Sequence, residues 1–265
     1  MTNLEFTKIS PTQNMTILVE SPVPRAAQPG VARSLMLRDP DTEQVGFMEP
    51  GRHGADLHLQ MAGGEFCGNA AISAAALFAQ KKALELGKNM LVSASVSGAP
   101  GALSVQVRRI SEARFAARLE MPLPLEISEK TLSFEGERFC LPLVRFPGIA
   151  HAIVSLEMTK EAAQLAAKKW CEDLNEDALG LMLLDGKRLT PLVYTKNPET
   201  LVWERSCASG SAAAGAFLAK EQGSGEFSFT QPGGTLCAEV QCDENGKIKS
   251  LHLKGNAEIL HKGKI

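Results

Sequence analysis

Two segments of the chain are small and apolar on every side, and no other sequence feature constrains the fold as strongly. They read AAISAAALFA over Ala70–Ala79 and SAAAGAFLA over Ser211–Ala219. A helix without a polar face has to be buried all round, because any side turned to water would expose apolar surface. We therefore expect each segment to form a helix around which a β-sheet wraps.

The same two segments reveal an internal repeat. A cysteine precedes each helix, Cys67 in the first and Cys207 in the second, and this spacing is about half of the 265-residue chain. Each helix is followed by a strand, a Gly/Pro-rich turn (97–101 and 231–234) and another strand. The repeat predicts two halves, residues 1–116 and 117–256, with the last segment, 257–265, completing the first half.

Short strands account for most of the remaining chain. Alternating apolar residues or short apolar runs indicate them, at 15–19, 45–48, 57–61, 103–107, 115–121 and 181–184. One further helix is expected after Thr159, which suits the N-cap position, and its single apolar face places it on the outside. The predicted fold class is α+β, with two pseudo-symmetric halves that each wrap a curved mixed sheet around a buried central helix.

Composition and charge exclude several classes of function. Apolar residues make up 44% and charged residues 22% of the chain, as in ordinary globular domains. The net charge of −2 leaves no broad basic surface for nucleic acid. Because the chain start lacks a secretory signal and no apolar run could cross a bilayer, we expect a cytoplasmic protein without a membrane partner. Six scattered cysteines should then be free thiols.

The position of the two cysteines points to acid–base chemistry. Backbone N–H groups and the helix dipole favour negative charge at a helix start, where a thiol can have a pKa of about 3.5 to 7.5. The N–H groups of Gly68, Asn69, Ala208 and Ser209 could also bind a carboxylate. If the halves face each other across a cleft, one sulfur removes an α-proton and the other delivers a proton to the opposite face. Packing would explain one such cysteine, but not its recurrence.

Both cysteine motifs resemble those of a known superfamily. Cys67–Asn69 (Cys-Gly-Asn) and Cys207–Gly210 (Cys-Ala-Ser-Gly) are similar to the catalytic motifs of the cofactor-independent diaminopimelate epimerases and proline racemases. The resemblance covers nearly the whole chain and implies that Cys67 and Cys207 are catalytic, that no cofactor is used and that the protein is a homodimer. One departure is Ala208, which replaces a family glycine, so this position needs no glycine geometry.

Three further residues take their roles from this resemblance. Asn14, before the first long strand, and Gln44 resemble family residues that contact the reacting amino acid. His151 resembles a family histidine and is given a supporting role, with a structural histidine as the alternative.

Longer blocks resemble one branch of the superfamily, the histidine racemases that supply D-histidine for opine-type metallophores. These blocks are 14–19, 64–70, 202–204 with 206–207, and 231–234. The resemblance implies that the amino-acid substrate is histidine. The alternatives are a diaminopimelate epimerase, a racemase of another amino acid, or a non-catalytic relative that only binds an amino acid.

The diaminopimelate alternative is disfavoured by the residues at the far end of the predicted substrate site. Epimerases hold the second amino-acid end of diaminopimelate with asparagines, whereas the matching positions here are Met61, Ile149 and Ala178. Apolar residues would leave the distal ammonium and carboxylate unpaired. Glu204 and Arg205 remain as polar groups that could bind the substrate.

Cofactor and metal sites have weaker support. Cys237 and Cys242, with His252 and His261 downstream, match no compact zinc pattern, and we read the two cysteines as packing residues. The glycine pairs 63–64 and 233–234 lack the rest of a phosphate-binding loop. No lysine has a context that suggests a pyridoxal phosphate Schiff base. The sequence therefore predicts no metal and no cofactor.

Overall fold

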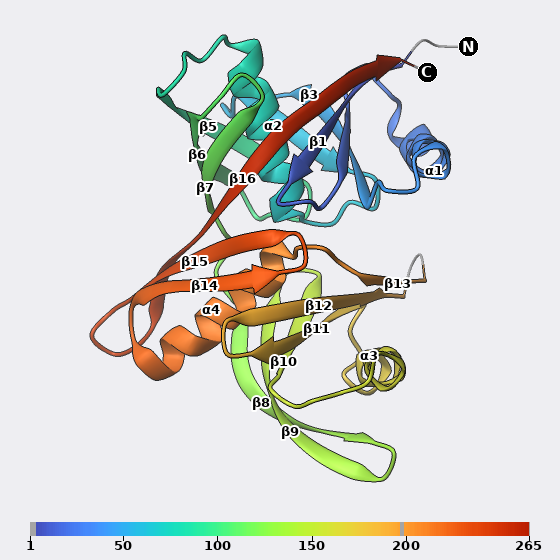
Figure 1. The fold of residues 1–265 in the computed structure, drawn as a ribbon, viewed down its shortest axis with the longest axis vertical. Helices are drawn as coiled ribbons and strands as arrows, with labels where there is room; N and C mark the ends of the chain where they lie inside the picture. The colour runs from blue at the N-terminus through green and yellow to red at the C-terminus, as the bar shows by residue number, and fades with distance from the viewer. Residues whose placement is uncertain (1–3, 197–198, 265) are drawn as a thin grey trace. The chain divides into compact units, whose positions relative to one another are not determined.

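The computed structural model describes residues 4–196 and 199–264 and divides into two compact units (Figure 1). Unit 1 is Met1–Met121 with Leu253–Ile265, and unit 2 is Pro122–His252. The predicted boundary after residue 116 falls inside strand β7 (Arg114–Glu120), and unit 1 includes the whole of that strand. Strand β16 (Ile248–Lys264) contributes residues to both units, so the second boundary lies within it.

The strands of unit 1 form a closed mixed barrel. In chain order they are β1 (Glu5–Pro11), β2 (Thr16–Val19), β3 (Gln44–Pro50), β4 (Leu57–Met61), β5 (Asn89–Val96), β6 (Ala102–Arg109), β7 and the end of β16. Each strand pairs with the next, and β16 pairs back with β1. The β2–β3 and β4–β5 pairs are parallel, and helices cross between them, as parallel pairing requires.

Helix α2 (Gly68–Lys81) lies inside this barrel and contacts strands β1 to β7 (Figure 1). Ala70, Ala71, Ala74 and Ala75 are all 0% exposed, because alanine lets the sheet approach the helix from every side. The buried helix predicted over Ala70–Ala79 is confirmed, with two more residues at each end.

Unit 2 has a similar order of elements, with one more strand before each of its two helices. Its strands are β8 (Glu126–Phe134), β9 (Glu137–Phe146), β10 (Ile149–Val154), β11 (Ala178–Asp185), β12 (Arg188–Thr195), β13 (Thr200–Trp203), β14 (Gly225–Gln231), β15 (Gly234–Cys242) and the start of β16. Again two pairs are parallel, β10–β11 and β12–β14, and in the chain a helix lies between the two strands of each pair. These helices are α3 (Lys160–Asp173) and α4 (Ala208–Gln222).

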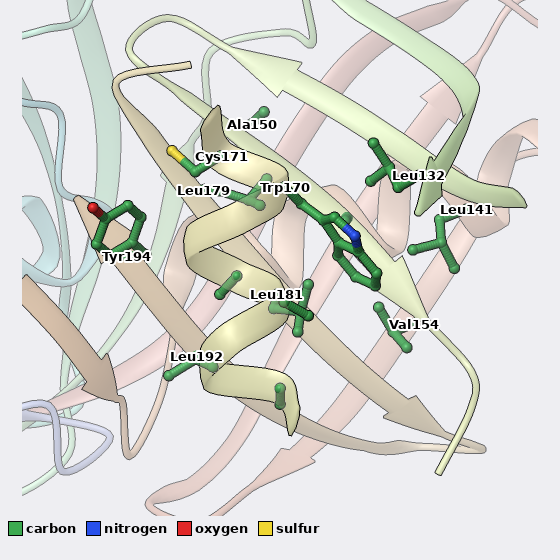
Figure 2. Packing of buried hydrophobic residues seen from close by; sticks show 14 of the residues in the cluster. Leu132, Leu141, Ala150, Val154, Trp170, Cys171, Leu179, Leu181, Leu192 and Tyr194 are labelled. Carbon is green, nitrogen blue, oxygen red and sulfur yellow. The ribbon is translucent and has the colours of Figure 1, made fainter. Parts of the chain in front are cut away.

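The two helices of unit 2 are buried to different extents. The apolar helix α4 contacts strands β9, β10, β11, β14 and β15, which confirms the second buried segment. Helix α3 packs one face on β8, β11 and β12. Trp170 on this face is fully buried (Figure 2). Its Nε1 donates to the carbonyl of Ser133 on β8. Its opposite face is open, with Leu165 58% exposed. Thr159 Oγ1 accepts from Ala162 N–H at 3.2 Å and caps α3 as predicted.

One helix was not predicted from the sequence. Helix α1 (Gln28–Arg38), preceded by the 3₁₀ turn η1 (Arg25–Ala27), packs near Val45 and Phe47 on the outer face of unit 1. Its N-cap makes no side-chain hydrogen bond, and only three of its residues are buried. Its sequence therefore lacks both the cap signal and the apolar stripe by which helices are recognised.

Candidate active site

Cys67 caps helix α2 with its own sulfur. Its backbone is extended (φ −132°, ψ 112°), and Sγ accepts a hydrogen bond from Ala70 N–H at 3.4 Å. This is the N-cap arrangement in which a side chain satisfies one of the unpaired N–H groups of the first turn. Gly68 and Asn69 follow as the first, buried residues of α2, so their N–H groups lie at the helix start as predicted.

A chain of hydrogen bonds connects the Cys67 sulfur to a carboxylate. Cys67 Sγ donates to Gln44 Oε1 at 2.7 Å, and Gln44 Nε2 donates to Asn14 Oδ1 and to Thr16 Oγ1. Asn14 Nδ2 in turn donates to Glu43 Oε2 at 2.6 Å. The structure thus brings Asn14 and Gln44 together with Cys67. This chain fixes the Gln44 amide with its oxygen toward the thiol.

Cys207 caps helix α4 in the same way. Its backbone is again extended (φ −121°, ψ 113°), and Sγ accepts from Gly210 N–H at 3.3 Å. The hydroxyl of Ser209 lies 3.6 Å from the sulfur. Ala208 begins the helix and is 3% exposed. Each unit therefore presents one cysteine at the start of its buried helix.

The electrostatic surroundings of Cys207 overturn one expectation. Burial raises the pKa of the Cys207 thiol well above its ordinary value, and the adjacent Glu204 carboxylate raises it further. The hydrogen bonds from Gly210 N–H and Ser209 act in the opposite direction, but they are weaker. The predicted lowering by the helix start is therefore wrong for Cys207, because desolvation and a neighbouring negative charge outweigh the helix dipole.

Gly210 packs tightly against Met182 and the Cys207 side chain. A Cβ added to Gly210 would lie 2.1 Å from Met182 Sδ and 3.2 Å from Cys207 Sγ. Met182 itself comes from β11 and is 0% exposed. Any side chain at position 210 would therefore displace either the methionine or the first turn of α4.

The remaining predicted residues of unit 2 differ in their environments. Glu204 is partly buried beside the Cys207 thiol, whereas Arg205 is exposed. His151 is 0% exposed on β10, and neither ring nitrogen has a hydrogen-bond partner among the residues that the structure describes. Burial lowers its pKa to about 3, so His151 packs as a neutral side chain against Gly180 and Phe146.

Neither a cluster of metal-ligating side chains nor a helix of membrane-spanning length is found among the described residues. Across residues 4–196 and 199–264, no group of three or more His, Cys, Asp or Glu side chains could hold a metal ion. Cys237 and Cys242 both lie on β15, while His252 and His261 are nine residues apart on β16. No helix in these same ranges is long and apolar enough to cross a membrane.

Sequence reasoning missed four residues that contact this machinery. They are Thr16 and Glu43 near Cys67, and Ser211 and Gln231 near Cys207. Gln231 carried a signal, since it opens the Gln-Pro-Gly-Gly block, but that block was interpreted as a turn and as a family resemblance, with no role for the glutamine. The others carry no pattern that distinguishes them from ordinary strand and helix residues.

Comparison with known proteins gives matches along the whole chain. Residues 3–265 match the family described as the histidine racemase CntK N-terminal domain. A histidine racemase from Fusobacterium nucleatum is 33% identical, with 99% of this chain and 97% of that protein covered. Another from Staphylococcus aureus is 28% identical, with 98% and 97% covered.

Solved structures also match, at lower identity. A hydroxyproline epimerase from Agrobacterium vitis gives a TM-score of 0.73 at 12% identity, covering 99% of this chain and 92% of that one. A phenazine biosynthesis protein of the PhzF family from Bacillus anthracis gives 0.70 at 13%, covering 100% and 99%. The chain therefore shares their fold, a barrel of mixed sheet with few helices.

Proposed function

Because the chain belongs to the histidine racemase CntK family, we propose that it is a cofactor-independent racemase that interconverts L- and D-histidine. Cys67 and Cys207 are its two acid–base groups. The observation that carries the proposal is the pair of cysteine N-caps, each with its sulfur at the start of a buried helix. One such thiol would be unremarkable in an alanine-rich helix, but the same arrangement in both units is what two-base chemistry needs.

We further propose that the units are pseudo-symmetric in the manner of diaminopimelate epimerase and that both cysteines act on the same substrate carbon. The similar order of strands and helices supports the pseudo-symmetry, as do the parallel pairs spanned by a helix in each unit.

The proton transfers follow from the surroundings of the two thiols. Burial and the Glu204 charge favour the protonated form of the Cys207 thiol, so Cys207 is assigned as the acid and Cys67 as the base. The Cys67 thiol, which donates to Gln44 Oε1 in the free protein, gives its proton to solvent before it acts as the base. The Cys67 thiolate takes the α-proton, the C–H electron pair remains on the substrate, and Cys207 delivers its proton to the opposite face of the same carbon. The products are the inverted amino acid, a Cys67 thiol and a Cys207 thiolate, and reversal restores the first state.

The substrate carboxylate would be bound by the helix starts. The N–H groups of Gly68 and Asn69 in one unit, and of Ala208 and Ser209 in the other, lie at the first turns of α2 and α4. Negative charge develops on the carboxylate as the α-proton leaves, and N–H groups at a helix start stabilise such charge. Asn14 and Gln44 complete the contacts to the reacting amino acid.

The side chain of the substrate is assigned to histidine rather than diaminopimelate. Met61 is fully buried and Ala178 is 8% exposed, so neither offers a partner for a distal ammonium or carboxylate. The Glu204 carboxylate can accept a hydrogen bond from an imidazole N–H, and Arg205 is a second polar group near it in sequence. A small polar ring therefore fits these residues better than a second amino-acid end.

Three broader properties belong to the same proposal. The free cysteines agree with a reducing, cytoplasmic location. The resemblance to metallophore-associated racemases favours a role in supplying D-histidine, and the superfamily favours a homodimer.

The test is chiral analysis of pure L-histidine incubated with the protein and no added cofactor. We expect conversion to the racemate, with no conversion by a variant that carries Cys67→Ser and Cys207→Ser together. Diaminopimelate, lysine and arginine serve as alternative substrates. Conversion of one of these in place of histidine would reassign the substrate, and tight histidine binding without conversion would favour a non-catalytic binding protein.

A further inference from the structure

A closed ring of hydrogen bonds holds both main-chain polar groups of Cys207. Cys207 N–H donates to Gln231 Oε1 at 2.8 Å, Gln231 Nε2 donates to Ser211 Oγ at 2.8 Å, and Ser211 Oγ donates to the Cys207 carbonyl at 2.7 Å. Gln231 is 5% exposed and Ser211 is 0% exposed, so water does not compete for these groups.

Only an amide of this length completes the ring. One side-chain atom has to accept from Cys207 N–H while another donates to Ser211, and glutamine provides both. Glutamate would keep the acceptor but would turn a second acceptor toward Ser211. Methionine has a similar length but would remove both hydrogen bonds.

The turn that carries Gln231 makes a second link to the same segment. Gly233 N–H donates to the Arg205 carbonyl at 2.6 Å, so the turn is bonded to the backbone at both 205 and 207. Gln231 is the last residue of β14 and is paired with Gly234 at the start of β15, and both strands pack on α4 (Figure 1). The cysteine-bearing segment is thereby fastened to the sheet that surrounds its helix.

We infer that Gln231 is a positioning residue that fixes the direction of the Cys207 thiol. Cys207 is an N-cap residue, so its N–H lies outside the helix and its φ is not set by helical hydrogen bonds. Binding both its N–H and its carbonyl fixes φ and ψ, and these angles set the direction of the Cα–Cβ bond that carries Sγ. The inference rests on the proposed two-thiol racemisation and assigns Gln231 to one of its two thiols.

Unit 1 cannot form the same ring around Cys67. The residue four positions after Cys67 is Ala71, which has no hydroxyl, and its N–H donates to the Cys67 carbonyl at 3.0 Å. The sulfur of Cys67 is instead held directly by Gln44. A change at Gln231 should therefore affect the chemistry of Cys207 and leave that of Cys67 intact.

The experiment compares inversion with exchange in Gln231→Met. In deuterium oxide, inversion needs both thiols, whereas one enantiomer can exchange its α-proton through Cys67 alone and keep its configuration. We expect kcat for inversion to fall about 10²-fold, as for a displacement of about 1 Å, with a smaller change in KM. Exchange with retention through Cys67 should stay within about threefold of wild type. Gln231→Glu, which keeps the acceptor for Cys207 N–H, should recover part of the inversion rate.

The matched control is Gln28→Met. Gln28 is also a buried glutamine, 1% exposed, and it bonds the Val23 carbonyl and Glu49 far along the chain from either cysteine. It should lose stability without changing the ratio of inversion to retained exchange. Wild-type inversion in Gln231→Met, or an equal loss of inversion and exchange, would overturn the inference.

A chemical readout keeps the inference testable if histidine is not the substrate. An absence of labelling in the wild type would reject the proposed function, and alkylation of the two thiols by iodoacetamide, followed by mass spectrometry, would then decide the role of Gln231. Loss of the Gln231 hydrogen bonds in Gln231→Met should change the rate of Cys207 alkylation at least about tenfold and leave the rate of Cys67 alkylation unchanged. Equal rates in variant and wild type would contradict it. If Gln231→Met does not fold, Gln231→Glu and Ser211→Ala take the same measurements.

Discussion

Cys67 and Cys207 share a local geometry but are held by different means. Both have an extended backbone, and both sulfurs accept from the third N–H of a buried helix. The Cys67 sulfur is bonded to the neutral amide of Gln44, whereas the Cys207 thiol lies beside the Glu204 carboxylate. The helix start therefore fixes where a sulfur lies, and its neighbours fix its protonation state.

This difference bears on how the two thiols divide the reaction. A racemase needs one base and one acid at the same time, so the protonation states of its two thiols have to differ during turnover. The negative charge near Cys207 favours its protonated form, whereas the Cys67 thiol donates to the neutral amide oxygen of Gln44. The substitutions below test this difference.

Replacing either cysteine with serine should abolish most of the inversion. A hydroxyl is a far weaker base than a thiolate, and the loss of one acid–base group costs about 10²- to 10⁴-fold in rate. Racemisation of histidine by Cys67→Ser and by Cys207→Ser, each followed by chiral chromatography, measures the effect. Each variant should still exchange the α-proton of one enantiomer only, and it should be the opposite enantiomer in the two variants. Exchange of the same enantiomer by both would remove the proposed division of roles.

Gly210→Ala should impair the Cys207 site through packing. The new Cβ would lie 2.1 Å from Met182 Sδ, so either the buried Met182 side chain or the first turn of α4 has to move, with an expected loss of about 10²-fold in kcat and about 1–3 kcal/mol of stability. Steady-state kinetics together with thermal unfolding separates the two effects. Shortening the obstructing side chain in Gly210→Ala/Met182→Ala should restore part of the activity.

Gly30→Ala is the matched control for that substitution. Gly30 lies in α1, and a Cβ there would meet nothing within 4 Å. Alanine is the better helix former, so this variant should be fully active and as stable as wild type or more so. A loss of activity in Gly30→Ala equal to that in Gly210→Ala would show that the clash is not the cause.

Gln44→Met should affect Cys67 moderately. It removes the acceptor for the Cys67 thiol and the donor to Asn14, and a hydrogen bond of this kind contributes about 0.5–1.5 kcal/mol, or about 3- to 10-fold in rate. The decrease should appear in kcat for histidine, while alkylation of Cys207 remains unchanged. Gln106→Met, at an exposed position of β6, is the control. A change in Cys207 reactivity would contradict separate anchoring of the two thiols.

Glu204→Gln should shift the pH profile without changing the shape of the site. The Glu204 charge raises the pKa of Cys207, so its removal lowers that pKa and Cys207 loses its proton at lower pH. The alkaline limb of kcat/KM, which reports the loss of this acid, should move toward lower pH. Glu199→Gln, at a surface ion pair with Lys168, should leave the limb in place. A limb that stays fixed or moves upward in Glu204→Gln would reject the role of this charge.

The secondary structure that surrounds the cysteines was largely predictable because its signals are local. An alanine-rich segment without a polar face has one stable location, and a threonine before a single apolar face marks a helix start, so α2, α3 and α4 all appear where predicted. Helix α1 has neither signal, since its N-cap makes no side-chain bond and its apolar stripe is short.

The chemistry of the site was less predictable because it depends on contacts between distant segments. A helix start alone suggested a low pKa for Cys207, but burial and Glu204 reverse that direction. Gln231 is 24 residues from Cys207 in the chain, and only the fold shows that its amide bonds the cysteine backbone. Cysteine spacing thus predicts which residues lie at the two helix starts, and tertiary contacts determine how each is held.

The most direct measurement of two-thiol catalysis is the position of the isotope during early turnover of protiated L-histidine in deuterium oxide. With two separate bases, the first D-histidine formed carries deuterium at Cα, because its proton comes from a thiol in exchange with solvent, while deuterium enters the remaining L-histidine more slowly than D-histidine forms. Mass spectrometry of the separated enantiomers gives both quantities. Early D-histidine that retains the original α-proton would show that a single base moves it between faces, and the pairing of Cys67 with Cys207 would then be wrong.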